Sequence, residues 1–236
     1  ANEAQNLTPK QVLHAKTIHS AGQDLLALIN QILDLAKIES GREEVRLDRV
    51  VLQDFVVYTR RVFEPLAADK GLSFVTEIAP GTPDAMITDR SRVERILTNL
   101  IGNAVKFTEQ GEVALRIGRP ASDDTSAIAF AVSDTGVGIP AHAHELVFAP
   151  FEQADVGPTR REAGTGLGPA IARETARLLG GDLRVESVPG RGTTFTCTLP
   201  ENQVAHVERT NGKPPAPRAD DARSELQSKL EQLTAE

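Results

Sequence analysis

The stretch Asn99-Leu-Ile-Gly-Asn-Ala-Val-Lys-Phe-Thr108 combines a polar helix face with an apolar one. Asn99 and Asn103 stand four positions apart, so their side chains share one face, and Lys106 follows within a turn. Amide oxygens can ligate Mg²⁺ and an ammonium group can neutralise phosphate, so this face suits a cation with bound phosphates. An ordinary solvated face is the alternative for this stretch taken alone. Helical spacing of the apolar residues predicts an amphipathic helix that contains Ile96, Leu97, Leu100, Ile101, Ala104 and Val105.

The composition is that of a globular protein with one large or two small domains. The chain has 236 residues, of which 40% are hydrophobic and 25% charged. Its net charge of −7 and its few aromatic residues (4%) argue against nucleic-acid binding. The single cysteine, Cys197, excludes an internal disulfide and a cysteine-based metal cluster. No apolar run reaches the roughly 18 residues that span a bilayer, so we expect a cytoplasmic chain without membrane contact.

A long helix is predicted from Lys10 to Glu39, with Thr8 as its cap and Ser40-Gly41 as its end. Its apolar positions recur about every 3.5 residues, which is typical of a bundle or coiled coil. The helix cannot bury this seam by itself, so a partner helix must come from the parent protein or from a second chain. The seam comprises Val12, Ala15, His19, Gly22, Leu25, Leu26, Ile29, Ile32, Leu33 and Ala36.

Strands and further helices are predicted from residue 45 to residue 200. Alternating β-branched stretches indicate strands, and Gly or Pro clusters mark the turns. Asp89 and Ser91 are candidate caps of the asparagine helix, and Ser91 forms a capping box with Glu94. The chain after residue 200 predicts a linker, then either a short helix over 224–233 or a disordered tail. The predicted strands are 45–50, 72–78, 86–88, 112–117, 127–132, 182–187 and 193–199, and the other predicted helices are 52–70 and 168–179.

Two glycine-bearing segments predict close approach of the backbone to a ligand. Gly136 and Gly138 lie in a tight loop after a strand, in Ser133-Asp-Thr-Gly-Val-Gly-Ile-Pro140. Gly164-Thr-Gly-Leu-Gly168 opens a helix, where free N–H groups and the helix dipole favour an anion. Asp134 can accept a hydrogen bond from an exocyclic amine such as that of adenine, or it can simply cap the turn. The chain lacks both the dinucleotide-binding fingerprint and the G-x-x-x-x-G-K-[ST] phosphate loop.

Two phenylalanines and two arginines between these segments each have two interpretations. Phe148 and Phe151 flank Pro150, and they are either core residues, which is the more usual role, or residues that stack on a ligand. Arg160 and Arg161 lie in a polar stretch, where they can reach a γ-phosphate or be solvated loop charges.

The order of the motifs is more specific than any one of them. Between residues 99 and 194 the chain carries Asn-x-x-x-Asn-x-x-Lys-Phe-Thr, Asp-x-Gly-x-Gly, Phe-x-x-Phe, Gly-Thr-Gly-Leu-Gly and Gly-x-Gly-Thr-Thr in succession. This series resembles the ATP-binding catalytic domain of bacterial sensor histidine kinases, in the wider GHKL group that includes gyrase-type and heat-shock-chaperone ATPases. The resemblance covers residues 45–200. It implies an α+β fold, the two-layer α/β sandwich of the Bergerat type, with a mixed sheet covered by about three helices.

The resemblance also implies where ATP binds. ATP would lie between the asparagine helix and the glycine loops, beneath a flexible lid at 152–166. Asn103 would ligate Mg²⁺, and Asn99 and Lys106 would lie near the phosphates. Asp134 would bind the adenine amine. The other residues implied at the nucleotide are Phe107, Gly136, Gly138, Ile139, Phe148, Phe151, Gly164, Thr165, Gly166, Leu167, Gly168 and Thr194.

Asn99 distinguishes the subfamilies of this group. Gyrase-like and chaperone ATPases carry a glutamate four residues before the Mg²⁺ asparagine, where it acts as general base for water. An amide cannot take that proton. The resemblance therefore favours transfer of the γ-phosphoryl group to a histidine over hydrolysis, and it argues against an ATP-driven chaperone or topoisomerase-like clamp.

The first predicted helix also resembles the kinase family. Its part from residue 25 to residue 39 looks like the second helix of a dimerisation and histidine-phosphotransfer hairpin, and the first helix, which carries the phosphoacceptor, is absent. His14 and His19 do not match the phosphoacceptor pattern, and we interpret them as surface or seam residues. The implied partners are a phosphoacceptor helix of the parent kinase, a response-regulator receiver domain and a second copy bound through residues 10–40. The implied domains are 1–44, 45–200 and 201–236.

Pro169 departs from the family pattern, which has a hydrophobic residue after Gly-Leu-Gly. Proline is tolerated in a first helical turn because that N–H has no helix partner, but it cannot donate to a phosphate. Together with the missing helix, Pro169 supports the alternative function, a degenerate nucleotide-sensing or protein-interaction module without kinase activity.

Overall fold

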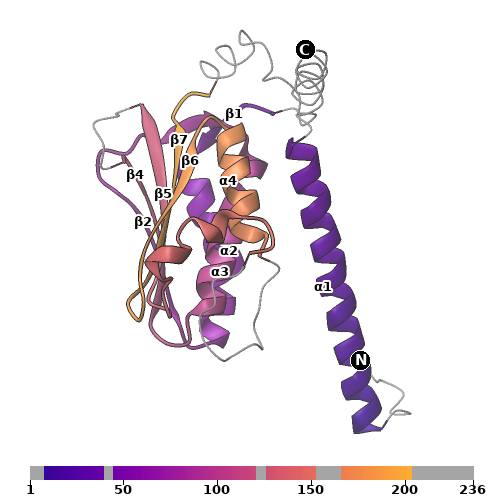
Figure 1. Ribbon diagram of the computed structural model, residues 1–236. Helices are drawn as coiled ribbons and strands as arrows, with labels where there is room; N and C mark the ends of the chain where they lie inside the picture. The colour runs from indigo at the N-terminus through magenta and orange to yellow at the C-terminus, as the bar shows by residue number, and fades with distance from the viewer. Residues whose placement is uncertain (1–7, 40–44, 121–125, 153–165, 204–236) are drawn as a thin grey trace, which may run out of the picture. The chain divides into compact units, whose positions relative to one another are not determined.

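The computed structural model describes residues 8–39, 45–120, 126–152 and 166–203. It contains one long helix, α1 (Pro9–Glu39), and an α/β domain that follows it (Figure 1). Several predictions lie outside the described residues, namely the helix end at 40–41, most of the turn at 120–125, Arg160 and Arg161, most of the lid at 152–166, and the linker and tail after residue 203.

The helix α1 confirms the prediction of a long N-terminal helix. Thr8 caps it, because the Thr8 Oγ1 accepts from the Gln11 N–H at 3.4 Å and the Gln11 side chain accepts from the Thr8 N–H at 2.8 Å. No helix in the described part of the chain is long and apolar enough to cross a membrane. Several large apolar side chains of α1 are exposed, namely Leu13, Ile18, Leu25, Leu26, Ile29, Ile32 and Leu33.

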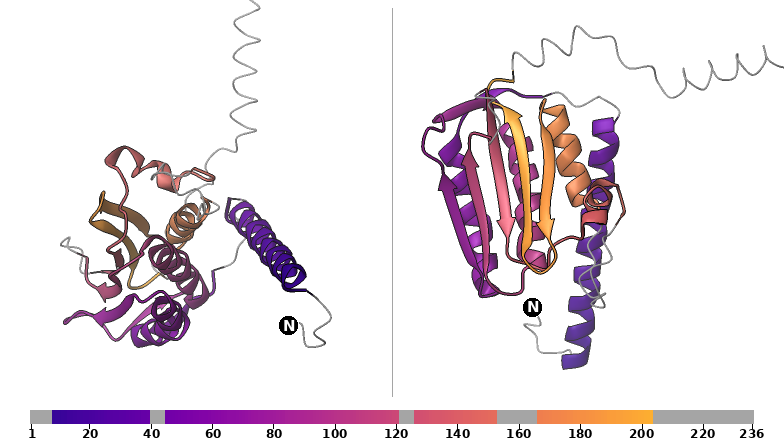
Figure 2. Two further views of the ribbon diagram at one scale, coloured as in Figure 1. Left: turned by 90° about the horizontal axis from the view of Figure 1, so that it is seen from below. Right: turned by 60° about the vertical axis from the view of Figure 1, so that its left-hand side comes forward.

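The domain is built on a mixed sheet of five strands in the order β2-β4-β5-β7-β6. β2 and β4 are parallel, and the other neighbouring pairs are antiparallel. The helices α2 (Leu52–Asp69), α3 (Arg90–Phe107) and α4 (Gly168–Leu178) lie along one face of this sheet, as the right-hand view of Figure 2 shows. This arrangement confirms the predicted two-layer α/β sandwich. The strands are β2 (Ser73–Ile78), β4 (Glu112–Gly118), β5 (Ala127–Asp134), β6 (Asp182–Val188) and β7 (Gly192–Pro200).

The core lies between the sheet and the helices α2, α3 and α4. Phe55 of α2 packs edge-on against Phe130 of β5, with ring centroids 5.6 Å apart. The apolar face predicted for α3 is buried, and Leu100 and Ile101 have no exposed surface. Cys197 is buried in β7, and burial raises the pKa of its thiol to about 12. Two short 3₁₀ turns, η1 (Ala141–Ala143) and η2 (Leu146–Phe148), connect β5 toward α4.

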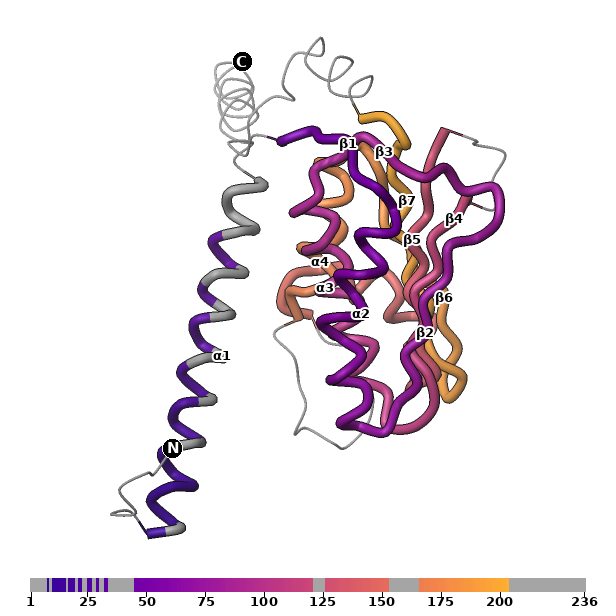
Figure 3. The backbone as a smooth tube through the Cα atoms, turned by 180° about the vertical axis from the view of Figure 1, so that it is seen from behind, coloured from indigo at the N-terminus to yellow at the C-terminus, as the bar shows by residue number. Residues whose placement is uncertain are grey.

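A small second sheet joins both ends of the domain (Figure 3). β1 (Asp48–Val51) pairs antiparallel with β3 (Ala85–Thr88), which leads into α3. The Ile87 N–H donates to the Glu201 carbonyl at 2.9 Å, and the Gln203 N–H donates to the Ile87 carbonyl at 3.2 Å. The strand predicted at 45–50 starts later than expected, at residue 48, because the Arg46 N–H bonds the Asp89 carboxylate instead of a neighbouring strand.

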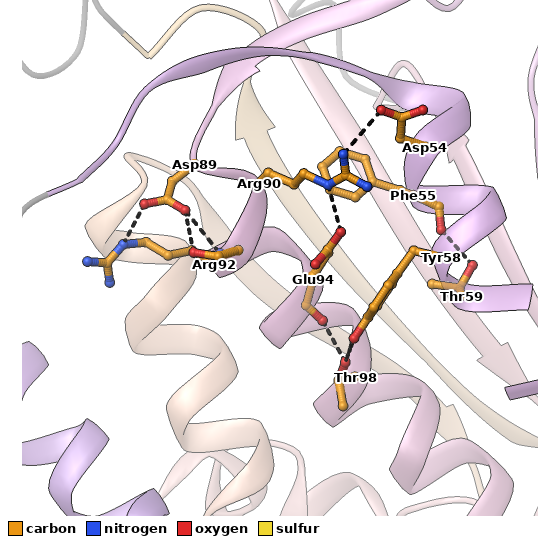
Figure 4. A network of polar contacts seen from close by, with 10 residues as sticks. Asp54, Phe55, Tyr58, Thr59, Asp89, Arg90, Arg92, Glu94 and Thr98 are labelled. Atoms are coloured by element: carbon orange, nitrogen blue, oxygen red, sulfur yellow. Dashed lines mark hydrogen bonds and ion pairs between the residues drawn. The ribbon is translucent and has the colours of Figure 1, made fainter. Parts of the chain in front are cut away.

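The predicted capping box at the start of α3 is wrong. Asp89 is the N-cap, and its carboxylate accepts from the Arg92 N–H at 3.2 Å (Figure 4). The Ser91 hydroxyl donates to the same carboxylate at 2.7 Å, and Glu94 accepts from Arg90 Nε at 2.8 Å. Asp89 takes the cap position because its carboxylate, at the end of β3, can accept from the Arg46 N–H, the Ser91 hydroxyl and the Arg92 N–H together.

The Asp89 carboxylate is buried beside Arg92, whose Nε lies 3.2 Å away. Burial opposes ionisation of Asp89. The hydrogen bonds from Ser91, Arg46 and Arg92, and then the charge of Arg92, outweigh that effect, so the pKa of Asp89 lies below its usual value. The ionised form of Asp89 therefore stabilises the folded domain at neutral pH.

The substitution Asp89→Asn should lower the free energy of unfolding by about 1–2 kcal/mol at pH 7, because it removes a charged helix cap. A carboxyl whose folded pKa is depressed contributes stability above its unfolded pKa of about 4, and that contribution is lost as the pH falls through the folded value. The difference between variant and wild type in urea unfolding should therefore shrink as the pH falls below about 4. The control is Asp54→Asn, because Asp54 forms an exposed pair with Arg90 and should change stability by at most about 0.5 kcal/mol. A difference in unfolding free energy between Asp89→Asn and wild type that stays constant from pH 7 to pH 3 would contradict this account.

Candidate functional site

The amide pair of α3 faces the start of α4. Asn99 and Asn103 are both half-buried. A methyl group built on Gly168, the first residue of α4, would lie 3.2 Å from Asn103 Nδ2 and 3.6 Å from Asn99 Oδ1. The absence of a side chain at residue 168 thus lets the amino end of α4 approach both amides. The structure brings together two predicted features, the asparagine face and the glycine-bearing helix start.

The amino end of α4 has the properties of an anion site. Its N-cap, Leu167, makes no side-chain capping bond, and Pro169 lies in the first turn. The first N–H groups of a helix have no intrahelical acceptor and lie at the positive end of the dipole. Leu167 itself is fully buried beside Ile171. Gly166 lies against the backbone of Phe151 and Glu152.

The carboxyl end of α3 carries a cation and an exposed aromatic ring. Lys106 is half-buried, and its Nζ lies 5.2 Å from the centre of the Phe107 ring. Phe107 is 43% exposed. Lys106 therefore provides a positive charge one turn after Asn103, as predicted from their spacing.

The loop after β5 packs against this end of α3. Asp134 is the last residue of β5, and its Oδ1 accepts from the Gly136 N–H at 2.8 Å. A methyl group on Gly136 would lie 2.5 Å from the Phe107 carbonyl oxygen and 2.9 Å from Asp134 Oδ1, so a larger residue cannot fit without a shift. Gly136 thus holds the Asp134 carboxyl close to the last turn of α3.

The environment of Asp134 raises its pKa above the usual value. Burial is the main cause, and hydrogen bonds from the Gly136 and Thr193 N–H groups offset part of it. A partly buried carboxylate that still has lone pairs to share is a good acceptor for an amine of a ligand. The alternative prediction, a turn cap, also describes Asp134, because it accepts from the Gly136 N–H two residues on.

Hydroxyl groups on β5, β6 and β7 form hydrogen bonds near the end of β5 that the sequence analysis did not predict. Thr194 of β7 shares a hydrogen bond of 2.9 Å with Ser133 of β5, its register partner. Ser187 of β6 accepts from the Ile139 N–H at 2.7 Å and bonds Thr193 at 2.9 Å. Alternation along the strands could have placed Ser133 and Thr194 on one face, but the register that pairs them is a long-range property.

The remaining predicted residues have mostly structural contacts. Ile139 is half-buried against the core, and Gly138 packs against the backbone of Val188. Phe148 packs edge-on against Phe195 with centroids 6.1 Å apart, and the Arg173 guanidinium lies 4.5 Å from its ring centre. These contacts favour the core interpretation of Phe148. Phe151 is exposed, with a positive φ of 66°, and Gly164 and Thr165 lie outside the described residues.

The polar side chains of this site fit a magnesium ion that is bound mainly by the phosphates of a bound molecule. The described residues contain no group of three His, Cys, Asp or Glu side chains that could hold a metal by itself. Mg²⁺ usually keeps several waters and is bound through one or two protein oxygens plus substrate phosphates. The amide of Asn103 provides one such protein oxygen beside Gly168, at the positive end of the α4 dipole.

Comparison with known proteins identifies this domain. Residues 88–203 match the family described as "Histidine kinase-, DNA gyrase B-, and HSP90-like ATPase". These residues are an ATPase domain of that family. The match runs from the end of β3 through α3, the Asp134 loop and α4 to residue 203, so it contains every described element of the site.

The relatives of the ATPase domain are sensor histidine kinases, which confirms the resemblance seen in the sequence. RpfC, a sensory/regulatory protein of Xanthomonas campestris, is 35% identical over 216 residues, which are 90% of this chain and 30% of that protein. The signal transduction histidine-protein kinase BarA of Escherichia coli is 37% identical over 190 residues, 80% of this chain and 21% of BarA. The chain thus spans less than a third of either relative.

The structure of full-length ShkA in complex with AMPPNP has the same fold as this ATPase domain. It superposes with a TM-score of 0.71 at 30% identity, over 83% of this chain and 40% of ShkA.

Proposed function

We propose that this chain is the ATP-binding catalytic part of a sensor histidine kinase, which transfers the γ-phosphoryl group of Mg·ATP to a histidine of a separate helix. The observation that carries the proposal is the arrangement of three features around α3: the Asn99 and Asn103 amides, the amino end of α4 beside Gly168, and the partly buried Asp134 carboxyl in the loop that packs against the end of α3. These features offer an oxygen ligand for Mg²⁺, N–H donors for phosphates and an acceptor for an amine. ATP is a ligand that needs all three.

In this proposal each residue has a distinct task. Asp134 accepts a hydrogen bond from the exocyclic amine of adenine, and Thr194 lies beside the base. The N–H groups at the start of α4 and the Lys106 ammonium neutralise the phosphates. Asn103 would hold Mg²⁺, which would supply positive charge beside the phosphates. Asn99 contacts phosphate through its amide.

Transfer to histidine is favoured over hydrolysis by the chemistry of Asn99. Attack by water needs a base that removes its proton, and an amide has no such capacity. The imidazole of a neutral histidine attacks phosphorus with its own lone pair, so this step needs no base at position 99. The bond from phosphorus to the bridging oxygen breaks, ADP leaves with that oxygen, and a phosphorus–nitrogen bond forms. Phosphate release in water should therefore be slow.

The phosphoacceptor helix and a receiver domain are proposed partners. His14 and His19 are exposed on α1, but their sequence surroundings do not match a phosphoacceptor. The exposed apolar residues of α1, such as Leu25, Leu26 and Ile29, suit packing against further helices of a dimeric hairpin. The relatives' kinase names support a two-component pathway, in which a response regulator takes the phosphoryl group from the histidine.

The experiment that tests this function has two steps. Calorimetric titration of the chain with Mg·ATP should give a dissociation constant between about 1 µM and 1 mM. The longer kinase that also contains the phosphoacceptor helix should then incorporate label from γ-labelled ATP into a phosphohistidine, which is labile in acid and stable in base. Binding without any histidine labelling would overturn the kinase proposal, and rapid phosphate release by the chain alone would favour the clamp-type ATPases.

A second candidate, a nucleotide-sensing module without kinase activity, is favoured by Pro169. This residue removes one donor from the first turn of α4, next to the amide pair. The substitution Pro169→Ala restores that N–H without adding bulk, and it should strengthen Mg·ATP binding about threefold if the N–H meets a phosphate, as expected for one added hydrogen bond. If the affinity for ADP rises by the same factor, the restored N–H contacts the α- or β-phosphate. No change in either dissociation constant would remove the main argument for this candidate.

A further inference from the structure

Lys70 belongs to none of the motifs discussed above, yet its side chain reaches the end of α3. It follows α2 as the C-cap residue. Its Nζ donates to the Val105 carbonyl at 3.0 Å and to the Lys106 carbonyl at 2.9 Å. A surface lysine thus connects the end of one helix to the end of the helix that carries the amide pair.

These two carbonyls are among the four that every α-helix leaves without helical partners at its carboxyl end. In α3 the four belong to residues 104–107. The Ala104 carbonyl accepts from Thr108, through the N–H at 3.1 Å and the hydroxyl at 2.7 Å. The Phe107 carbonyl lies against Gly136. Lys70 supplies donors for the other two carbonyls, and its positive charge lies at the negative end of the helix dipole.

The turn that Lys70 caps is also the turn that carries Lys106, and Asn103 lies one turn earlier. Helix ends fray when their last groups lack partners. Loss of the Lys70 donors should therefore loosen the backbone of Lys106 first. The Asp134 carboxyl is held differently, by its own strand β5 and by the Gly136 and Thr193 N–H groups. A change at Lys70 should thus affect the phosphate side of the site more than the base side.

We infer that Lys70 is a positioning residue for the phosphate side of the site. Its two hydrogen bonds keep the last turn of α3 helical and thereby hold the Lys106 ammonium where the polyphosphate binds. The inference rests on the proposed function and deepens it, because it assigns a structural cause to the placement of Lys106.

The test compares Mg·ATP with AMP, which lacks the β- and γ-phosphates. In Lys70→Met the dissociation constant for Mg·ATP should rise about fivefold, the size of a lost interaction between a charge and a helix dipole, and the constant for AMP should change less than about twofold. Lys70→Arg keeps a charge and several donors, so it should restore most of the Mg·ATP affinity. The control Arg61→Met also removes one positive charge from an exposed position of α2, and it should leave both constants unchanged.

Hydrogen exchange of the nucleotide-free chain gives a second readout. The amides of residues 106–108 bond to the carbonyls of the preceding turn, so they should exchange faster in Lys70→Met and at the wild-type rate in Arg61→Met. Unchanged exchange with unchanged Mg·ATP affinity would overturn the inference, and so would equal losses of AMP and Mg·ATP affinity. If the wild-type chain bound no Mg·ATP, the proposed function itself would fail; if it bound and Lys70→Met bound equally well, the positioning role alone would fail.

Discussion

The variant Asn103→Ala should bind Mg·ATP at least about 100-fold more weakly than the wild type. The substitution removes the proposed oxygen ligand of Mg²⁺ and a neighbour of the Gly168 backbone, and a loss of roughly 3 kcal/mol is expected when a contact to a charged group is deleted. Its fold should be retained, because Asn103 is half-buried on the polar face of α3 and the apolar face is unchanged. Calorimetric titration with and without Mg²⁺ measures the effect.

The matched control for Asn103→Ala is Thr98→Ala on the same helix. Thr98 is exposed, and its hydroxyl bonds Tyr58 at 3.0 Å on a different side of α3 (Figure 4). This control should bind Mg·ATP like the wild type. The effect of Asn103→Ala should also fall when Mg²⁺ is replaced by EDTA, because its largest part depends on the metal. Wild-type affinity of Asn103→Ala in the presence of Mg²⁺ would exclude the ligand role.

The variant Asp134→Asn should lose about 10- to 100-fold in affinity for Mg·ATP, the cost of a hydrogen bond to a charged acceptor. The amide is nearly isosteric but presents an NH₂ group, which can donate to the carbonyl oxygen of guanine and repels the amine of adenine. The ratio of the Mg·ATP and Mg·GTP dissociation constants should therefore move toward one. Titrations with the two nucleotides measure this ratio.

The pH dependence of binding gives an independent check on Asp134. Because burial raises the pKa of this carboxyl above its usual value of about 4, it gains a proton at a higher pH than an exposed aspartate does. A protonated carboxyl is a poorer acceptor, so Mg·ATP affinity should fall as the pH decreases through that raised pKa, and Asp134→Asn should lack this step. Asp48→Asn, a substitution at an exposed aspartate of β1, serves as the charge control. An identical pH profile for Asp134→Asn and wild type would contradict the assigned role.

Local patterns in the sequence predicted the elements of the domain well. The apolar residues of α3 recur at helical spacing, and the structure buries them, with Leu97 and Leu100 fully inaccessible. A helix was predicted over 52–70, and Gly71, which follows the C-cap residue Lys70 of α2, has a positive φ of 74° that ends the helix. These features depend on a few neighbouring residues, so periodicity and turn chemistry suffice to find them.

It was harder to predict which of two neighbouring residues caps the start of α3. Asp89 and Ser91 are both good helix caps, and the sequence pattern alone favoured the capping box of Ser91 and Glu94. The structure selects Asp89 because the Arg46 N–H, 43 positions earlier in the chain, also bonds its carboxylate. The start of β1 was misplaced for the same reason, since Arg46 is engaged by Asp89 rather than by a strand.

The assembly of the site likewise depends on contacts between distant residues. Spacing placed Asn99 and Asn103 on one face, but it could not show that Gly168 approaches them. Spacing also gave no sign that Gly136 packs against the Phe107 carbonyl, or that Ser133 faces Thr194. The resemblance to histidine kinases implied only that the asparagine helix lies near the glycine loops. The pairing of Ser133 with Thr194 depends on the register of β5 and β7.

The small sheet of β1 and β3 lies where the chain enters and leaves the domain. The chain enters through β1 and departs through residues 201–203, and both segments hydrogen-bond to the single strand β3. Because both ends of the domain are hydrogen-bonded to one strand, the domain can be joined to different neighbouring domains without disturbing its sheet or its helices. A chimera that keeps residues 45–203 and replaces the rest of the chain should therefore retain the structure of this domain.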